Sequence, residues 1–143
     1  MAGRYIFHLA FPVADLEASR RFYVDVLGAS IGRENAEWLD ILLWGHQITL
    51  HLRPDEVLPL ERQGKRHFGV VLPWAKWQRL VQRIAAGSAS FYKNPEVFFE
   101  GAEQEQAKFY LKDPGNNIIE IKAYRNFGAT LKQNGDRYNY EQT

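Results

Sequence analysis

Three histidines and one glutamate, all side chains that bind divalent metals, recur at matched places along the chain. His8 and His67 each open a segment typical of a strand followed by a helix, and they are 59 positions apart (67 − 8). His51 and Glu120 lie in the last strand-like segment of each half, TLHL and IIEI, and are 69 positions apart (120 − 51). The sequence therefore predicts two copies of one motif. Folded around a pseudo-twofold axis, the copies would bring these four groups together.

The chemistry of this set is that of a catalytic metal site. Two neutral imidazoles and one carboxylate leave about three positions open in an octahedral shell, and open positions distinguish catalytic from structural metals. The chain has no cysteine, which excludes thiolate ligands and disulfides. Each residue alone has an ordinary alternative role, as a hydrogen-bonded strand histidine or a solvated carboxylate. Glu120, however, lies among isoleucines, where burial without a positive partner would be costly.

The first half has the pattern of a strand, a helix and three further strands. Residues 5–12 alternate between two faces, which is typical of a strand. Asp15 is a suitable N-cap for the helix that follows, and Gly28 is suitable for its C-terminal end. The remaining strands are expected at 29–34, 37–43 and 47–53, the last two as a hairpin near Trp44–Gly45.

The second half repeats this order after a polar connector at 54–65 that contains two prolines and a glycine. A strand is expected at 67–72, a helix at 74–86, a strand within 90–98, and a hairpin of 106–112 with 117–124 around the turn sequence DPGN. We therefore predict one domain over residues 1–125, with module 1 at about 5–53 and module 2 at about 66–125. Residues 126–143 are expected to form a mobile or partner-binding tail.

The final hairpin predicts its own register. If its turn is centred on Gly115, directly opposed residues have numbers that sum to 230, so Tyr110 faces Glu120 and Lys108 faces Lys122. Directly opposed residues share a face of the sheet. This register makes one face polar, to line a cavity, and the other apolar, to pack on helices. The expected apolar pairs are Phe109 with Ile121 and Leu111 with Ile119.

Composition excludes several functions. The 143 residues carry 18 basic and 17 acidic side chains, a net charge of +1, which gives no electrostatic basis for binding nucleic acid or an anionic membrane. Neither a long apolar run nor a signal peptide is evident, so a cytoplasmic location is expected. The expected partner is instead a small-molecule substrate.

Three segments resemble the vicinal oxygen chelate superfamily, which includes glyoxalase I, extradiol dioxygenases and the fosfomycin- and bleomycin-resistance proteins. They are HLAFPVADLEASRRFYVDVLG, HFGVVL and FYLKDPGNNIIEIKAY. The resemblance implies an α+β fold in which two βαβββ modules pair into a curved, open, barrel-like mixed sheet with helices on the outside. It also implies a homodimer, and the site can be completed within one chain or across the dimer.

Within this superfamily, the site residues are most similar to those of extradiol dioxygenases. That likeness implies iron held by His8, His67 and Glu120, a proton-moving His51 outside the ligand set, and Tyr110 hydrogen-bonded to a substrate oxygen. The hypothesis is an Fe(II)-dependent dioxygenase that acts on a catechol-like or other vicinal-oxygen molecule, whose adjacent oxygens chelate the metal. Ni, Zn or Mn could bind the same ligands, and Lys108 and Lys122 could orient an anionic substituent.

Two alternatives stay open at this point. One is a glyoxalase I-like isomerase or lyase that uses Ni or Zn. In that family a metal-binding glutamate holds the place of His51. The other is a metal-free protein that binds a drug or small molecule. The chain also departs from the dioxygenases, because it has no histidine after His67.

Overall fold

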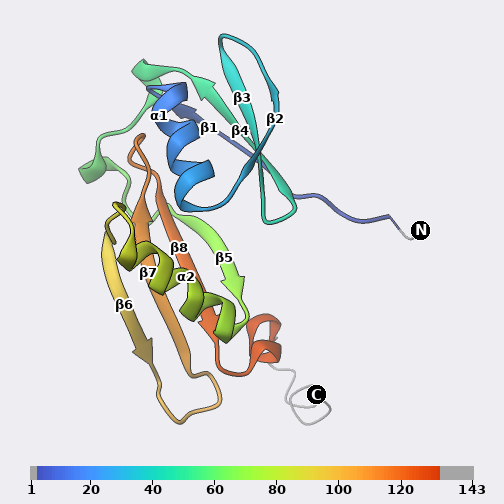
Figure 1. Cartoon of the computed structure of the whole chain (residues 1–143), viewed down its shortest axis with the longest axis vertical. Helices are drawn as coiled ribbons and strands as arrows, with labels where there is room; N and C mark the ends of the chain where they lie inside the picture. The colour runs from blue at the N-terminus through green and yellow to red at the C-terminus, as the bar shows by residue number, and fades with distance from the viewer. Residues whose placement is uncertain (1–2, 133–143) are drawn as a thin grey trace. The chain divides into compact units, whose positions relative to one another are not determined.

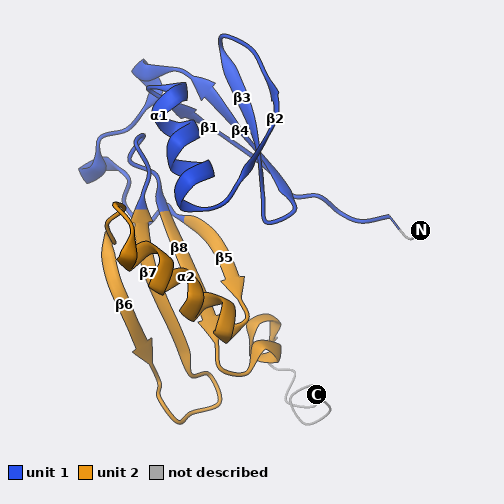
Figure 2. Cartoon of the chain, in the orientation of Figure 1, with its two compact units in different colours: residues 1–67, 112–118 blue, residues 68–111, 119–143 orange. Residues whose placement is uncertain are grey.

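The computed structural model describes residues 3–132 and shows an α+β chain of two βαβββ modules, as predicted. Each module forms its own four-stranded mixed sheet, and neither sheet closes into a barrel. The chain divides into two compact units (Figure 2). Unit 1 comprises Met1–His67 and Lys112–Ile118, and unit 2 comprises Phe68–Leu111 and Ile119–Thr143. The turn of the last hairpin therefore belongs to unit 1.

Unit 1 contains the first module and the connector (Figure 1). Its sheet has the order β1-β4-β3-β2, with β1 parallel to β4 and the other neighbours antiparallel. Two short 3-10 helices occupy the predicted connector. The elements are β1 (His8–Val13), α1 (Leu16–Arg21), the π-helical turn η1 (Phe22–Val26), β2 (Ser30–Glu34), β3 (Trp38–Leu43), β4 (His46–Leu52), η2 (Pro54–Glu56) and η3 (Leu60–Arg62).

The ends of the first helix follow the sequence signals. The carboxylate of Asp15 accepts a hydrogen bond from the backbone N–H of Ala18 at 3.0 Å, which caps α1. Gly28 has a φ of +76°, a conformation that glycine adopts without the strain of a Cβ. Between them, α1 contacts β3 and β4, and the buried Tyr23 of η1 joins the core. The helix therefore covers the apolar face of the sheet.

The first strand is shorter than the prediction. It begins at His8, whereas Tyr5, Ile6 and Phe7 are 95%, 62% and 62% exposed. The backbone N–H of Phe7 donates to the side chain of His46 at 3.0 Å and not to a carbonyl of the ladder. The alternating pattern of 5–7 therefore does not mark a buried face.

Unit 2 contains most of the second module. Its sheet has the order β5-β8-β7-β6, with β5 parallel to β8. Helix α2 lies over one face of this sheet (Figure 1), where the indole N–H of Trp77 donates to the carbonyl of Ile121 at 2.9 Å. The elements are β5 (Phe68–Leu72), α2 (Trp74–Ala86), β6 (Lys93–Phe98), β7 (Gln106–Lys112), β8 (Ile118–Tyr124) and the 3-10 helix η4 (Phe127–Leu131).

The β7–β8 hairpin has the predicted register. Near the turn, the N–H of Asp113 donates to the carbonyl of Asn117 at 3.0 Å, and at the far end the N–H of Arg125 donates to the carbonyl of Glu105 at 2.9 Å. Both pairs of numbers sum to 230, so the register does not shift along the hairpin. The apolar face is buried as expected, with Phe109, Leu111, Ile119 and Ile121 at most 1% exposed.

The turn of this hairpin is tied to the first helix within unit 1. The hydroxyl of Tyr23 donates to a carboxylate oxygen of Asp113 at 2.6 Å. The other oxygen accepts from the backbone N–H groups of Gly115 and Asn117, each at 2.8 Å. Burial raises the pKa of Asp113. The FY and DPGN motifs of the sequence thus meet in one buried hydrogen-bonded cluster.

The predicted tail is partly structured, because η4 forms within it. The tail's tyrosines at positions 138 and 140 lie outside the described residues. No helix within residues 3–132 combines the length and the apolar character needed to span a bilayer.

Candidate metal centre

The sheet of unit 1 carries a polar row on the face that includes His8. The parallel register of β1 with β4 sets His8 beside Gln47, Ala10 beside Thr49 and Pro12 beside His51. Strand β3 extends the row, because Asp40 pairs with Thr49. The residues between these on β4, Ile48 and Leu50, are buried in the core. One sheet face is therefore built for polar chemistry and the other for packing.

Asp40 is the buried centre of this row. It is only 3% exposed, and one carboxylate oxygen accepts from the hydroxyl of Thr49 at 2.6 Å. The other oxygen lies 3.4 Å from Nε of Arg33 and 3.5 Å from the amide nitrogen of Gln47. A buried carboxylate needs such partners to offset its lost hydration. Asp40 in turn holds the amide of Gln47 with its nitrogen toward β3 and its oxygen toward His8.

That orientation determines how His8 presents its ring. Nδ1 of His8 lies 2.8 Å from Oε1 of Gln47. Because an amide oxygen only accepts hydrogen bonds, Nδ1 carries the proton, and Nε2 of the neutral ring holds the lone pair. A metal-binding histidine typically donates its other N–H to an oxygen in this way.

His67 has the same arrangement at the end of unit 1. Its Nδ1 lies 2.7 Å from the backbone carbonyl oxygen of Lys65, which is also only an acceptor. The neutral ring therefore holds its lone pair on Nε2, like His8. In both predicted histidine ligands, Nε2 is therefore the nitrogen that could bind a divalent ion.

Glu120 lies on β8, between β5 and β7, and is 8% exposed. Nζ of Lys108 lies 3.9 Å from its carboxylate and is the positive partner that the sequence required. Tyr110 lies opposite, as the register predicted. Burial, the charge of Glu120 and a hydrogen bond to its carboxylate raise the pKa of Tyr110, so the phenol keeps its proton.

Gly69 allows β5 to approach Glu120 closely. A Cβ at this position would lie 1.6 Å from the carbonyl oxygen of Glu120, which is the residue that pairs with it on β8. Glycine is the residue that permits such an approach of one backbone to another. The position of Glu120 therefore depends on the absence of a side chain at residue 69.

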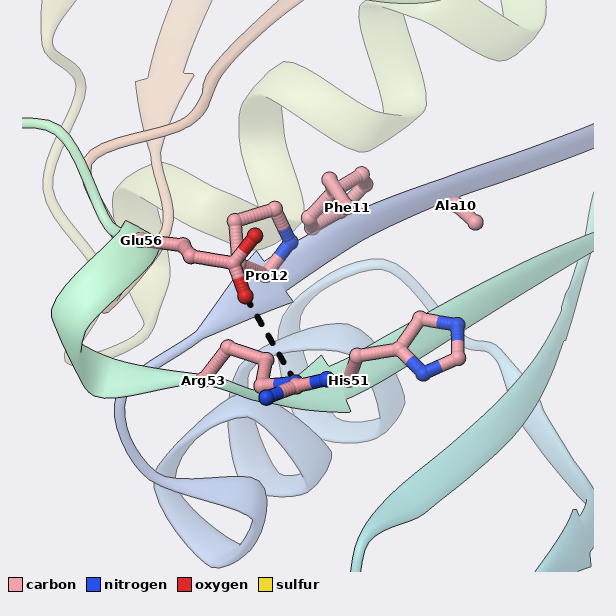
Figure 3. Close-up of a pocket in the computed structure, with 6 residues that line it drawn as sticks. All are labelled: Ala10, Phe11, Pro12, His51, Arg53 and Glu56. Atoms are coloured by element: carbon pink, nitrogen blue, oxygen red, sulfur yellow. Dashed lines mark ion pairs between the residues drawn. The ribbon is translucent and has the colours of Figure 1, made fainter.

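His51 lies at the edge of an open pocket of about 300 Å³ in unit 1 (Figure 3). The pocket is also lined by Ala10, Pro12 and an ion pair between Arg53 and Glu56, whose closest charged atoms are 3.5 Å apart. The imidazole of His51 points away from this ion pair (Figure 3). His51 pairs with Pro12, which lies four residues along β1 from His8. At the rise of a strand, four residues span about 13 Å.

The strand registers correct one step of the sequence argument. Glu120 pairs with Gly69, which lies two residues after His67. The residue two after His8 is Ala10, and it pairs with Thr49. Thr49, and not His51, therefore holds the place in module 1 that Glu120 holds in module 2. Spacing along the chain does not show which residues of two paired strands lie side by side. For this reason the sequence argument matched Glu120 with His51, two residues beyond Thr49.

The predicted ligands are divided between the two units: His8 and His67 belong to unit 1 and Glu120 to unit 2. Within residues 3–132, no group of three or more histidine, cysteine, aspartate or glutamate side chains lies close enough together to hold a metal ion. The joint site stays a prediction. Each of the three groups nevertheless has chemistry that fits a divalent metal.

Sequence reasoning did not find Gln47 and Asp40. Strand parity carried a signal for Gln47, because it shares a face with Thr49 and His51. The pairing of His8 with Gln47 depends on the parallel register of β1 and β4, which sequence spacing does not specify.

Proteins similar to this chain in sequence and fold are known. A family model of the Glyoxalase/Bleomycin resistance protein/Dioxygenase superfamily matches residues 5–121. The chain belongs to this superfamily. The match covers both modules, including all five predicted site residues, and agrees with the resemblance seen in the sequence.

Three relatives illustrate the range of the superfamily. A glyoxalase/bleomycin resistance protein/dioxygenase from Alicyclobacillus acidocaldarius is 30% identical, with a TM-score of 0.80 over 92% of this chain and 100% of that one. The virulence protein STM3117 of Salmonella typhimurium is 28% identical over 82% of each chain. The fosfomycin resistance protein FosX of Listeria monocytogenes shares the fold, with a TM-score of 0.67 at 18% identity over 84% of this chain and 93% of that one.

Proposed function

We propose that this superfamily member is a divalent-metal enzyme whose ligands are His8, His67 and Glu120. The observation that carries the proposal is the matched geometry of the two histidines, since Nδ1 of each donates to an oxygen, at 2.8 and 2.7 Å, as the second nitrogen of a metal-binding histidine typically does. A bound divalent ion would act as a Lewis acid on two neighbouring oxygens of a small substrate.

The remaining residues hold protons and charge around that ion. Tyr110 keeps its proton, because its pKa is raised, and can donate to Glu120 or to a substrate oxygen. Lys108 supplies a positive charge 3.9 Å from the carboxylate. Gln47 and Lys65 fix the two imidazoles through their oxygens.

The leading reaction is the Fe(II)-dependent oxygenation of a catechol-like or other vicinal-oxygen molecule. Two imidazoles and one carboxylate are the ligands of non-haem Fe(II) oxygenases, and the open positions admit a substrate and dioxygen. His51 would act as the acid and base of this reaction, from the edge of the pocket in Figure 3. Ni, Zn and Mn are the competing metals.

An isomerase or lyase reaction without oxygen is the second candidate, and one observation favours it. His51 lies about 13 Å along the strand from the row of His8. A Lewis-acid reaction that uses Tyr110 and the ligands alone does not require His51 to reach the substrate. Under the dioxygenase hypothesis, His51→Ala should lower turnover without changing metal content. Under the isomerase or lyase hypothesis, it should have little effect on turnover or on metal content.

Metal content tests the ligand assignment directly. Protein purified without chelators should hold one divalent ion per chain, and His8→Ala, His67→Ala and Glu120→Gln should each lose it while circular dichroism stays unchanged. His46→Ala is the matched control, because His46 accepts a hydrogen bond from Phe7 and lies outside the ligand set. Full metal occupancy in His67→Ala would refute the assignment, and a metal-free wild-type protein would favour the drug-binding alternative.

The reaction is tested by oxygen uptake. Consumption of dioxygen with a catechol by the iron-loaded protein supports the dioxygenase. Turnover that persists without oxygen, with Ni or Zn bound, supports the isomerase or lyase and contradicts the dioxygenase.

We also propose a homodimer, supported by the exposed apolar side chains of Tyr5, Ile6 and Phe7. Mixed dimers of His8→Ala with His67→Ala distinguish the two ways of completing the site. If each site takes His8 from one chain and His67 from the other, a mixed dimer keeps one intact site. If each site lies within one chain, the mixed dimer binds no metal.

A further inference from the structure

The sheet face around Glu120 in unit 2 has an unusual charge arrangement. Lys108 and Lys122 are directly opposed on β7 and β8, because the register sums to 230 along the hairpin. The backbone bonds join the pairs 113/117 and 105/125, so the pair 108/122 is of the non-hydrogen-bonded type, in which side chains approach most closely. Directly opposed like charges destabilise a sheet.

Further groups add to the positive charge. Lys93 pairs with Tyr110 from β6, and its ammonium lies 5.1 Å from the centre of that ring. Glu96 pairs with Lys108 on the same face. This sheet face therefore carries three lysines and two glutamates. A divalent ion bound to Glu120 would add two positive charges.

Each of the two opposed ammonium groups has neighbours of its own. Lys108 lies 3.9 Å from Glu120 and 4.6 Å from the centre of the Phe98 ring, and its side chain is 28% exposed. Lys122 donates to the hydroxyl of Tyr124 at 3.3 Å. An anion between them would relieve their mutual repulsion. Ammonium groups on flexible stems are well suited to bind oxyanions.

We infer that the substrate carries an oxyanionic group, of the carboxylate or phosphonate kind, that binds to Lys108 and Lys122 while its neighbouring oxygens reach the ion. The inference rests on the proposed function, because it places the metal at Glu120. When that carboxylate neutralises part of the charge of an ion, Lys108 loses part of its own compensation. A substrate anion then supplies the missing negative charge.

A matched pair of ligands tests this subsite. Catechol and 3,4-dihydroxybenzoate share the chelating oxygens and differ in one carboxylate. On the Mn²⁺-loaded protein, measured by calorimetry without oxygen at low ionic strength, the wild type should bind the carboxylated ligand at least tenfold more tightly. The variant with Lys108→Met and Lys122→Met should lose that preference, measured as the ratio of its own affinities for the two ligands.

Two further variants separate charge from folding. Lys108→Arg keeps a positive charge and should retain the preference, and Lys76→Met removes an equal charge from the exposed side of α2 and should change nothing. An unchanged preference in the double variant, or an equal loss in Lys76→Met, would overturn the inference.

Inorganic phosphate, titrated into the metal-free protein and followed by nuclear magnetic resonance, makes the test independent of the metal. Loss of phosphate binding in the double variant supports the subsite even if Mn²⁺ does not bind to the wild type, a result that would refute the proposed function alone. Phosphate binding that is equal in wild type and double variant overturns the subsite.

Discussion

The amide of Gln47 is predicted to set the metal affinity of His8, and Gln47→Leu removes it with little change in volume. The hydrogen bond that is lost joins Nδ1 of His8 to Oε1 of Gln47 at 2.8 Å. A bond of this kind contributes about 0.5–1.5 kcal/mol, which corresponds to roughly a twofold to tenfold change in affinity. Loss of an outer-shell partner typically weakens metal binding about 10- to 100-fold.

The exposure of His8 selects between these ranges. Water can replace the lost oxygen at an exposed ring, so the lower range applies. We therefore expect the Kd for Mn²⁺, measured by calorimetry at pH 7, to rise about 2- to 10-fold in Gln47→Leu. Asp40→Asn should have a smaller effect, because Asp40 acts through a longer contact of 3.5 Å to Gln47.

A second readout needs no metal. Nitrogen chemical shifts of the His8 ring report which nitrogen carries the proton, and wild type should show Nδ1–H, whereas Gln47→Leu should show a mixture of tautomers. Gln78→Leu, the same change on the exposed side of α2, is the control and should leave both measurements unchanged. The reasoning is refuted if Gln47→Leu binds Mn²⁺ like the wild type while His8→Ala does not bind it.

Further predictions concern the framework that holds the site. Tyr23→Phe removes the 2.6 Å hydrogen bond to the buried Asp113 and should lower the free energy of unfolding in urea by about 1–3 kcal/mol. Burial and the Asp113 carboxylate raise the pKa of Tyr23 well above its ordinary value of 10.0, so the folded state keeps a proton that the unfolded state loses. Stability should therefore fall as the pH rises above about 10, less steeply in Tyr23→Phe. Gly69→Ala sets a Cβ 1.6 Å from the backbone oxygen of Glu120 and should cost about 1–3 kcal/mol or more in a thermal melt, whereas Gly3→Ala, with nothing within 4 Å, should cost almost nothing.

Much of the architecture could be predicted because local signals were strong. Asp15 and Gly28 marked the ends of the first helical segment, and helix 74–86 was predicted to the residue. The alternation of polar and apolar residues in the last hairpin gave its register, because a slip of one residue would have moved the apolar side chains out of the core. The strand predicted from residue 5 was wrong at its start, because alternation shows which residues share a face but not whether that face is covered.

The site divides between sequence and structure in the same way. Residue type and order along the chain indicated His8, His67, Glu120 and Tyr110, because imidazole and carboxylate groups can be read directly from a sequence. The sequence could not show that Gln47 and Lys65 orient the two imidazole rings, or that Thr49 occupies in module 1 the place of Glu120 in module 2. Those facts depend on which residues of two parallel strands lie side by side. Segments far apart in the chain acquire that offset when the sheet assembles, so the tertiary structure alone decided it.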